Sequence, residues 1–302
     1  MSFVVRPGAR GRSLLRIVVL SLVLASRREE AQAGTLVGIT FGDNGSAVLY
    51  NVDPGSGATS NPRATGLADV AGIAFAPDGT LFGLTTFASA SVNPSSVSNA
   101  LYTIDPTSGT ATLVGATGLS NIFEGDLAFD PTTGKLYGLQ SLPSVPSSER
   151  DLFQLNPATG QATVLGAVRT AGGDLSAMAF DNSGNLFIVD TSSASVLRVD
   201  KSTGAVLSSV SLSLSSLGEL AGMAVDPETG IVYFGNGNVV NGVSTSGSLY
   251  TLDTATGALT LQGSSVALAG LSFMPIPEPG GLLLVGFGLA GISAARRRHP
   301  TS

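Results

Sequence analysis

The side chains of this sequence that are best suited to catalysis are carboxylates. Glu124, Asp126 and Glu219 stand just before repeated apolar segments and could reach one face of a repetitive fold. Two acids converging in one pocket are what glycoside hydrolysis needs. There is no Trp and there are only five Tyr, so few rings are available to line a sugar site. The sequence predicts no catalytic residue and a protein that is not an enzyme, with a hydrolase as the alternative.

Other catalytic and metal-binding residue types are scarce. The chain has no Cys, and its single His is His299, which excludes cysteine nucleophiles, thiolate zinc sites and histidine triads in the body. Asp43-Asn44-Gly45 and the stretch 181–185 are rich in oxygen donors. Neither has the Asp-x-Asp-x-Asp-Gly spacing with a distant Glu of a calcium loop. We predict no cofactor and no metal, and a calcium site remains the alternative.

Two series of aspartates recur along the chain and could be a ring of ligands or a set of turn residues. The first series is Asp53, Asp105, Asp200 and Asp253, with Asn156 in the remaining copy. The second series is Asp78, Asp130, Asp181 and Asp226. Each Asp recurs together with a Pro- or Gly-containing turn, and Asp opens turns by bonding its own backbone. The turn interpretation is therefore favoured for both series.

The elements that carry these residues form a repeat. One motif reads LYNVDPGSG, LYTIDPTSG, LFQLNPATG, VLRVDKSTG and LYTLDTATG, beginning at 49, 101, 152, 196 and 249. Each copy is followed by a short segment such as ATLVG at 111. Another motif reads AGIAFAPDG, GDLAFDPTTG, SAMAFDNSG, AGMAVDPETG and AGLSFMP, beginning at 71, 125, 176, 221 and 269. The last motif reads LFGL, LYGL, LFIV and VYFG, beginning at 81, 136, 186 and 232. Alternating apolar residues in these motifs predict strands.

One copy is displaced. The motif that includes LFGL has only four copies that follow a turn. Its fifth copy is LVGITF at 36–41, at the other end of the body. The motifs recur about every 44 to 54 residues, a repeat length that is typical of propeller blades. A blade that takes strands from both ends of the body would close the ring. We predict an all-β five-bladed propeller of about twenty strands over residues 34–275. The alternatives are an open β-solenoid, or a six-bladed ring that uses the loops at 86–99 and 236–247.

Charge is divided between the body and the two ends. Charged residues are 12% of the chain, about half the usual share. Residues 34–276 hold six basic and eighteen acidic groups, whereas the other nine basic groups lie in the terminal segments. An acidic body repels phosphate, so the sequence predicts no nucleic-acid partner.

The N-terminal segment, residues 1–33, has the features of a signal peptide. Four arginines precede the apolar run 17–25, and Ala31-Gln32-Ala33 is a small-x-small cleavage pattern. Nine apolar residues form only ~14 Å of helix, too short to cross a bilayer stably. We predict export, with signal peptidase cutting after Ala33.

The C-terminal segment, residues 276–302, has three parts in order. Pro277, Glu278 and Pro279 are followed by sixteen uncharged residues, 280–295, and then by Arg296, Arg297 and Arg298. Sixteen residues form ~24 Å of helix, slightly less than the ~30 Å hydrocarbon core. The arginines would stay on the cytoplasmic side. The pattern predicts a single transmembrane helix with the body outside the membrane.

This C-terminal pattern resembles the PEP-CTERM sorting signal of exported proteins of Gram-negative bacteria. The resemblance implies that an exosortase, an integral-membrane transpeptidase, recognises Pro277 to Pro279 and processes the tail, with Arg296 to Arg298 as the stop signal. It also implies a transient anchor in the inner membrane, then a place at the cell surface or in the extracellular matrix. The expected function is adhesion or interaction with biofilm polysaccharide. The alternative is a secreted hydrolase or lactonase-like propeller that uses carboxylates and calcium.

Overall fold

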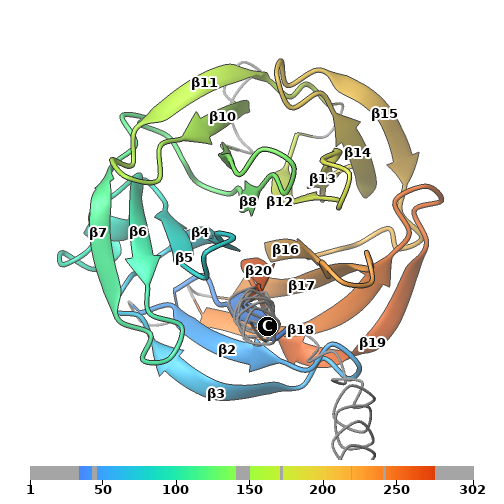
Figure 1. The fold of residues 1–302 in the computed structure, drawn as a ribbon. Helices are drawn as coiled ribbons and strands as arrows, with labels where there is room; N and C mark the ends of the chain where they lie inside the picture. Colours follow the sequence, from blue (N-terminus) through green and yellow to red (C-terminus); the bar gives the residue numbers. More distant parts are fainter. Residues whose placement is uncertain are drawn as a thin grey trace, which may run out of the picture. The chain divides into compact units, whose positions relative to one another are not determined.

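The protein is described by a computed structural model that covers residues 34–42, 46–140, 150–170, 173–218, 220–240 and 243–275. In this part of the chain, five four-stranded antiparallel sheets are arranged as the blades of a propeller (Figure 1). We name the blades A to E in chain order. Blade A consists, from its innermost strand outward, of β20 (Gly270–Phe273), β1 (Leu36–Ile39), β2 (Val48–Val52) and β3 (Thr59–Ala64).

The other four blades each use consecutive strands, again from the innermost outward. Blade B consists of β4 (Val70–Phe75), β5 (Leu81–Thr85), β6 (Ala100–Ile104) and β7 (Ala111–Ala116). Blade C consists of β8 (Leu127–Phe129), β9 (Leu136–Leu139), β10 (Asp151–Leu155) and β11 (Ala162–Ala167). Blade D consists of β12 (Leu175–Phe180), β13 (Leu186–Asp190), β14 (Ser195–Val199) and β15 (Val206–Ser211). Blade E consists of β16 (Leu220–Val225), β17 (Val232–Val240), β18 (Val243–Leu252) and β19 (Leu259–Val266).

The position of each strand in its blade follows from its composition. The inner strands are runs of small and apolar residues, and β4 and β12 are buried at every position. A strand buried on both faces is expected to read as a continuous apolar run. The outer strands carry exposed Thr and Ser, as in β15. The innermost strands contact one another in a closed circle, in the order β4, β8, β12, β16, β20 and back to β4.

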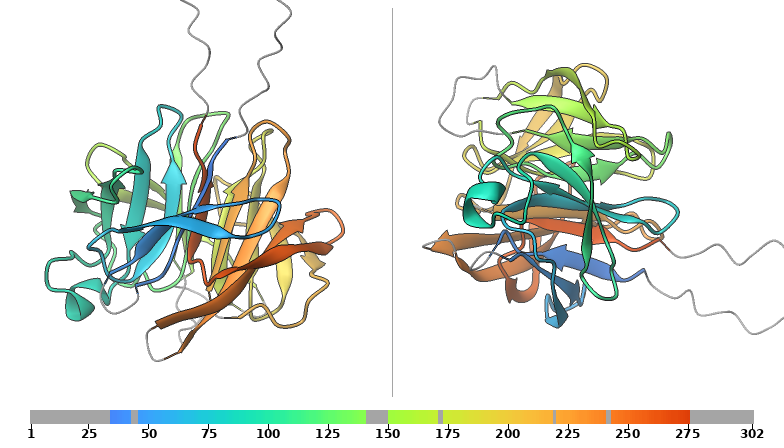
Figure 2. Two further views of the ribbon diagram at one scale, coloured as in Figure 1. Left: turned by 90° about the horizontal axis from the view of Figure 1, so that it is seen from below. Right: turned by 90° about the vertical axis from the view of Figure 1, so that its left-hand side faces the viewer.

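Blade A closes the ring, as the displaced motif predicts. Strand β1 pairs with β2 on one side and with β20 on the other, and Leu36 lies opposite both Val52 and Phe273. Figure 2 shows the first and last strands side by side. The five-bladed propeller is confirmed, and the solenoid and the six-bladed ring are wrong. The loop at 86–99 holds one helical turn, α2 (Ser89–Val92). The described residues of the segment 236–247 belong to strands β17 and β18.

The core lies between neighbouring blades. One cluster joins residues of blades C and D, among them Leu152 of β10 and Met178 of β12, both fully buried. Burying a side chain of this size stabilises a fold by about 1.5–3 kcal/mol. Turn glycines allow the outer strands of neighbouring blades to approach one another closely. Gly160, with φ of 77°, approaches β7 so closely that a Cβ would lie 2.4 Å from the carbonyl oxygen of Gly115.

Candidate functional site

The first aspartate series lies in the turns between the third and fourth strands of the blades. In each turn the side-chain oxygen accepts a backbone N–H two residues further on, at 2.7–2.9 Å. Asn156 does the same with the amide of Ala158, which is why Asn can replace Asp there. The turn amides lower the pKa of Asp105 and Asp253, and the hydroxyl of Ser202 together with its amide lowers that of Asp200. These residues shape turns, as the sequence favoured, and lie on separate blades.

The second series lies in the turns that follow the innermost strands, and three of its members act only locally. Asp78, Asp181 and Asp226 accept amides of their own turns, at 2.9 Å in each case. Both oxygens of Asp181 are occupied, one by the side chain of Asn185 at 2.7 Å. Within the described residues, no three acidic or histidine side chains lie close enough together to hold a metal ion.

Asp130 differs from the other members because it joins two blades. It is fully buried, and its Oδ2 receives Lys201 Nζ from the outer turn of blade D at 2.5 Å. The same Nζ lies 5.6 Å from the ring centroid of Phe180. Burial would raise the pKa of Asp130, but hydrogen bonds from Lys201, Thr132 and Thr133 outweigh it and lower that pKa to about 2. The ionised carboxylate of Asp130 therefore links blades C and D through its ion pair with Lys201.

Of the three candidate catalytic acids, Glu219 lies outside the described residues, and the other two occupy different places. Ser176 Oγ lies 3.5 Å from Glu124 Oε2, beside a small hollow of about 10 Å³ at the end of the axis where the inner strands begin. Asp126 has no exposed surface and lines no pocket. Glu124 and Asp126 therefore do not form a paired-acid site.

Asp126 lies at the propeller axis. Its carboxylate accepts the amide of Leu127 at 2.8 Å and that of Met178, in β12, at 3.0 Å. The amide of Met223, in β16, bonds it as well. One side chain thus joins the inner strands of three blades. Burial raises the pKa of Asp126 well above its ordinary value, despite these donors.

Small residues surround this carboxyl group. The positions equivalent to Asp126 in the other four copies of the motif are occupied by Gly72, Ala177, Gly222 and Gly270. A Cβ on Gly72 would lie 2.4 Å from Asp126 Oδ1. Asp126 therefore fills the space left by the missing side chain of Gly72 in the neighbouring blade. Its side chain lies on the axis between the two ends of the propeller.

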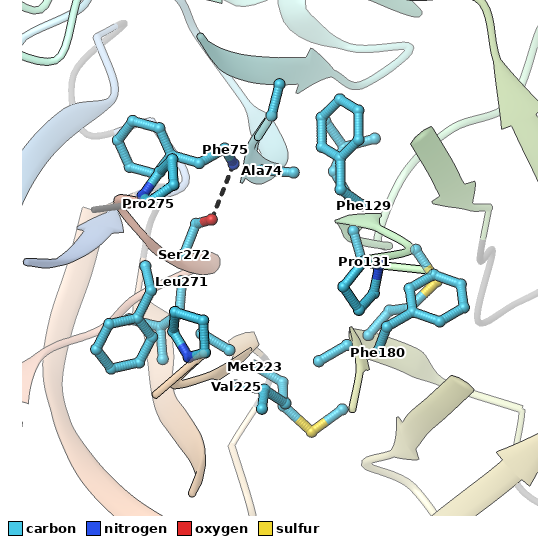
Figure 3. A pocket seen from close by; sticks show the side chains of 18 of the residues that line it. Ala74, Phe75, Phe129, Pro131, Phe180, Met223, Val225, Leu271, Ser272 and Pro275 are labelled. Atoms are coloured by element: carbon cyan, nitrogen blue, oxygen red, sulfur yellow. Dashed lines mark hydrogen bonds between the residues drawn. The ribbon is translucent and has the colours of Figure 1, made fainter. Parts of the chain in front are cut away.

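The larger hollow lies at the other end, where the inner strands finish, and we call it the axial hollow (Figure 3). Its volume is about 290 Å³. One position of the repeated motif forms its wall in every blade: Phe75, Phe129, Phe180, Val225 and Phe273. Sequence reasoning missed this site because it treated apolar positions as core. The recurrence of Phe in four of five copies was the available signal.

The sorting and cleavage residues cannot be placed. Pro277, Glu278, Pro279, Arg296, Arg297 and Arg298 lie outside the described residues, as do Ala31, Ala33 and the stretch 43–45. Among the helices of the described ranges, none has the length and apolar character needed to span a membrane.

Fold and repeats define the class of this chain as a five-bladed β-propeller. Residues 87–293 match the family model of a repeat of unknown function, DUF6923, and the chain belongs to that family. No curated protein matches the sequence.

Several solved structures are similar to this chain at low identity. A chain of a nidogen/laminin complex is 12% identical, with a TM-score of 0.48, over 80% of this chain and 98% of its own. A protein of unknown function from Bacteroides caccae is 8% identical, with a TM-score of 0.47, over 80% and 99%. A gluconolactonase from Xanthomonas campestris is 14% identical, with a TM-score of 0.43, over 78% and 77%.

Proposed function

We propose that the protein is an exported, exosortase-sorted surface or matrix protein, whose propeller is a non-enzymatic module for adhesion or polysaccharide binding. The observation that carries the proposal is that the ring is complete between residues 34 and 275. All five blades have four strands without any residue of segments 1–33 or 276–302. Both segments could be removed without taking a strand from the fold, which sorting by cleavage requires.

The ends of the ring support the same proposal. Strands β1 and β20 are antiparallel neighbours, and the Met274 amide donates to the carbonyl of Thr35 at 2.9 Å. The start of β1 and the end of β20 therefore lie at the same end of blade A. An anchor that follows Pro275 would leave the opposite ends of the blades free for partners.

The acids of the described residues support a role without catalysis. The two aspartate series are engaged in turns, and Asp126 is enclosed at the axis. The outer strands instead present hydroxyl groups to solvent, such as Thr112, Thr163 and Ser208. Rows of hydroxyls suit hydrogen bonding to a polysaccharide. One observation favours the hydrolase alternative, which is the proximity of Glu124 to Ser176 beside the small hollow.

The first test is the mass and both termini of the protein recovered from its native host. We expect a chain that begins at Gly34 and ends near Pro279. A variant with Glu278→Ala and Pro279→Ala should keep its tail and stay in the membrane fraction. A matched control, Pro275→Ala, changes a proline outside the triplet and should be processed normally. An intact tail on the wild-type protein would refute the sorting proposal.

The second test separates binding from catalysis. The recovered protein is incubated with host extracellular polysaccharide, with and without a chelator. Retention of the protein on the polysaccharide without release of reducing ends is the expected result. Turnover that Glu124→Gln abolishes would favour the hydrolase, whereas absence of both binding and turnover would refute the polysaccharide role.

A further inference from the structure

The innermost strand of each blade turns one edge towards the propeller axis, where no further strand pairs with it. In blade D, the amide of Asp181 donates to the carbonyl of Asn185 in the adjacent strand. Because only every second residue of an antiparallel strand bonds to a given neighbour, Phe180 directs its N–H to the opposite side, towards the axis. The same register holds at the equivalent positions of the other blades, which are Phe75, Phe129, Val225 and Phe273. These five residues line the axial hollow.

Two side chains show that amides on this edge bind oxygen acceptors. Ser272 Oγ, in blade A, accepts the amide of Phe75, in blade B, at 2.9 Å (Figure 3). One layer deeper, two residues back along the strands, the carboxyl group of Asp126 accepts the amides of Met178 and Met223. The inner edges of neighbouring blades therefore converge closely enough for one carboxyl group to bond to two of them.

At the level of the hollow, only blade A has a hydroxyl in the position of Ser272. The equivalent positions in the other four copies of the motif are Ala74, Ala128, Ala179 and Ala224. Alanine offers no acceptor, so the amides of Phe129, Phe180, Val225 and Phe273 lack the hydroxyl that Phe75 has. The hollow that they face has a volume of about 290 Å³. A cavity of about 150 Å³ binds benzene, so this one has room for a ring with a carboxyl group.

The surroundings of these amides favour an acceptor with a negative charge. Among the residues that the structure describes, no acidic side chain lines the hollow. Converging backbone amides form sites for anions, and hydrogen bonds to a charged acceptor are roughly twice as strong as neutral ones. The carbonyl groups of the same five residues also face the axis and would suit an ammonium group. Both acceptors that the axis already holds, Ser272 Oγ and the carboxyl group of Asp126, bond to amides, which favours a carboxylate.

We propose that the axial hollow binds a small carboxylate, whose oxygens accept the axis-facing amides of the inner strands as Asp126 does one layer deeper. The alanine, proline and methionine side chains around these amides contact the apolar body of the ligand. The site is independent of the sorting signals and of any polysaccharide role.

Three probes with one ring test this preference on the full chain. They are benzoate, benzamide and benzylammonium, titrated by calorimetry at pH 7. We expect benzoate to bind at least about tenfold more tightly than benzylammonium, with benzamide between them. The acidic body repels an anion at long range, so added salt should not weaken the binding of benzoate. The proposal fails if benzylammonium binds as tightly as benzoate, or if benzoate does not bind at millimolar concentration.

Substitutions that add or remove one hydroxyl locate the site. Ala128→Ser gives blade C the hydroxyl that Ser272 gives blade A, so it should occupy the amide of Phe180 and weaken benzoate binding about three- to tenfold. Ser272→Ala frees the amide of Phe75 and should strengthen benzoate binding about twofold. The control is Ala255→Ser, which adds the same hydroxyl on an exposed outer turn of blade E and should change nothing.

A second serine keeps the proposal open to refutation if Ala128→Ser unfolds. Ala179→Ser should act on the amide of Val225 as Ala128→Ser acts on that of Phe180, and a thermal transition like that of the wild type shows that the fold is intact. If both serine variants are folded and neither weakens benzoate binding, the carboxylate lies elsewhere on the molecule and the proposal is wrong.

Discussion

The propeller axis and the seam between blades C and D each enclose an aspartate with no exposed surface, and the pKa values of the two are shifted in opposite directions. Asp126 and Asp130 are four residues apart in the same copy of the motif. The pKa of Asp126 is raised well above its ordinary value by burial, whereas that of Asp130 is lowered to about 2. Burial alone therefore does not decide the charge of a carboxyl group.

The partners explain the difference. Asp126 has only backbone amides around it, and these do not offset the loss of water. Asp130 has an ammonium group and two threonine hydroxyls, which outweigh the effect of its own burial. The axis thus holds an acid whose neutral form burial favours, and it joins three inner strands. The seam holds an acid whose charged form its partners favour, and it joins two blades. Replacing Asp126, or the lysine that pairs with Asp130, tests this difference.

The largest effect is expected from removing the partner of the charged acid. Lys201→Met leaves Asp130 buried without its counterion, and breaking a buried pair costs about 3–5 kcal/mol. Lys201 is 31% exposed, so solvent reduces this to about 2–3 kcal/mol. The melting temperature should fall by roughly 5–10 °C, at about 2–4 °C per kcal/mol. Calorimetric melting at pH 7 measures it.

Two further variants separate the ion pair from the loss of a surface cation. Arg198→Met on the same blade removes only a bond from Nη2 to Asn185 Oδ1 and should change the melting temperature little. Adding Asp130→Asn to Lys201→Met should recover part of the loss, because no buried charge then remains. If Lys201→Met and Arg198→Met lowered the melting temperature by similar amounts, the ion pair would not stabilise the contact between blades C and D.

A smaller effect, with a distinct pH dependence, is expected from the neutral acid. Because the pKa of Asp126 is higher in the folded than in the unfolded state, its contribution to stability is complete below about pH 4. That contribution is lost as the pH rises towards the folded pKa, by about 1.4 kcal/mol per unit. Asp126→Asn abolishes this loss. The melting temperature of the wild type minus that of the variant should therefore decrease as the pH rises from 4.

The control for this profile is an acid with the opposite shift. Turn hydrogen bonds lower the pKa of Asp78, so its contribution is present above about pH 4 and lost as the pH falls. The melting temperature of the wild type minus that of Asp78→Asn should therefore rise with pH, and this change should be confined to pH values below about 4. If Asp126→Asn gave a constant difference from pH 4 to pH 8, the acid at the axis would be charged rather than neutral.

The sequence predicted the repeat and its closure better than it predicted the two buried acids. Turn chemistry and apolar alternation are local, so five copies of a motif and one displaced copy were enough to predict the ring. The bond from Lys201 to Asp130 joins residues 71 positions apart, and no local pattern indicates it. The role of Asp126 follows only from comparing one position across blades, where the neighbouring blade has Gly72 and leaves the space that Asp126 fills.

The smallest effect is expected from the exposed aspartates of the outer turns. Asp105 accepts the amides of Thr107 and Ser108, and Asn156 makes the equivalent bond in the next blade with a neutral side chain. Asp105→Asn keeps the oxygen that the bond needs but loses the charge that the turn amides favour, so it should lower the melting temperature only slightly at pH 7. If the outer aspartates instead bound calcium, the wild type would gain stability in millimolar calcium and the variant would lose that gain. Melting curves of both proteins with calcium and with a chelator distinguish the two, and we expect calcium to shift the transition of neither protein.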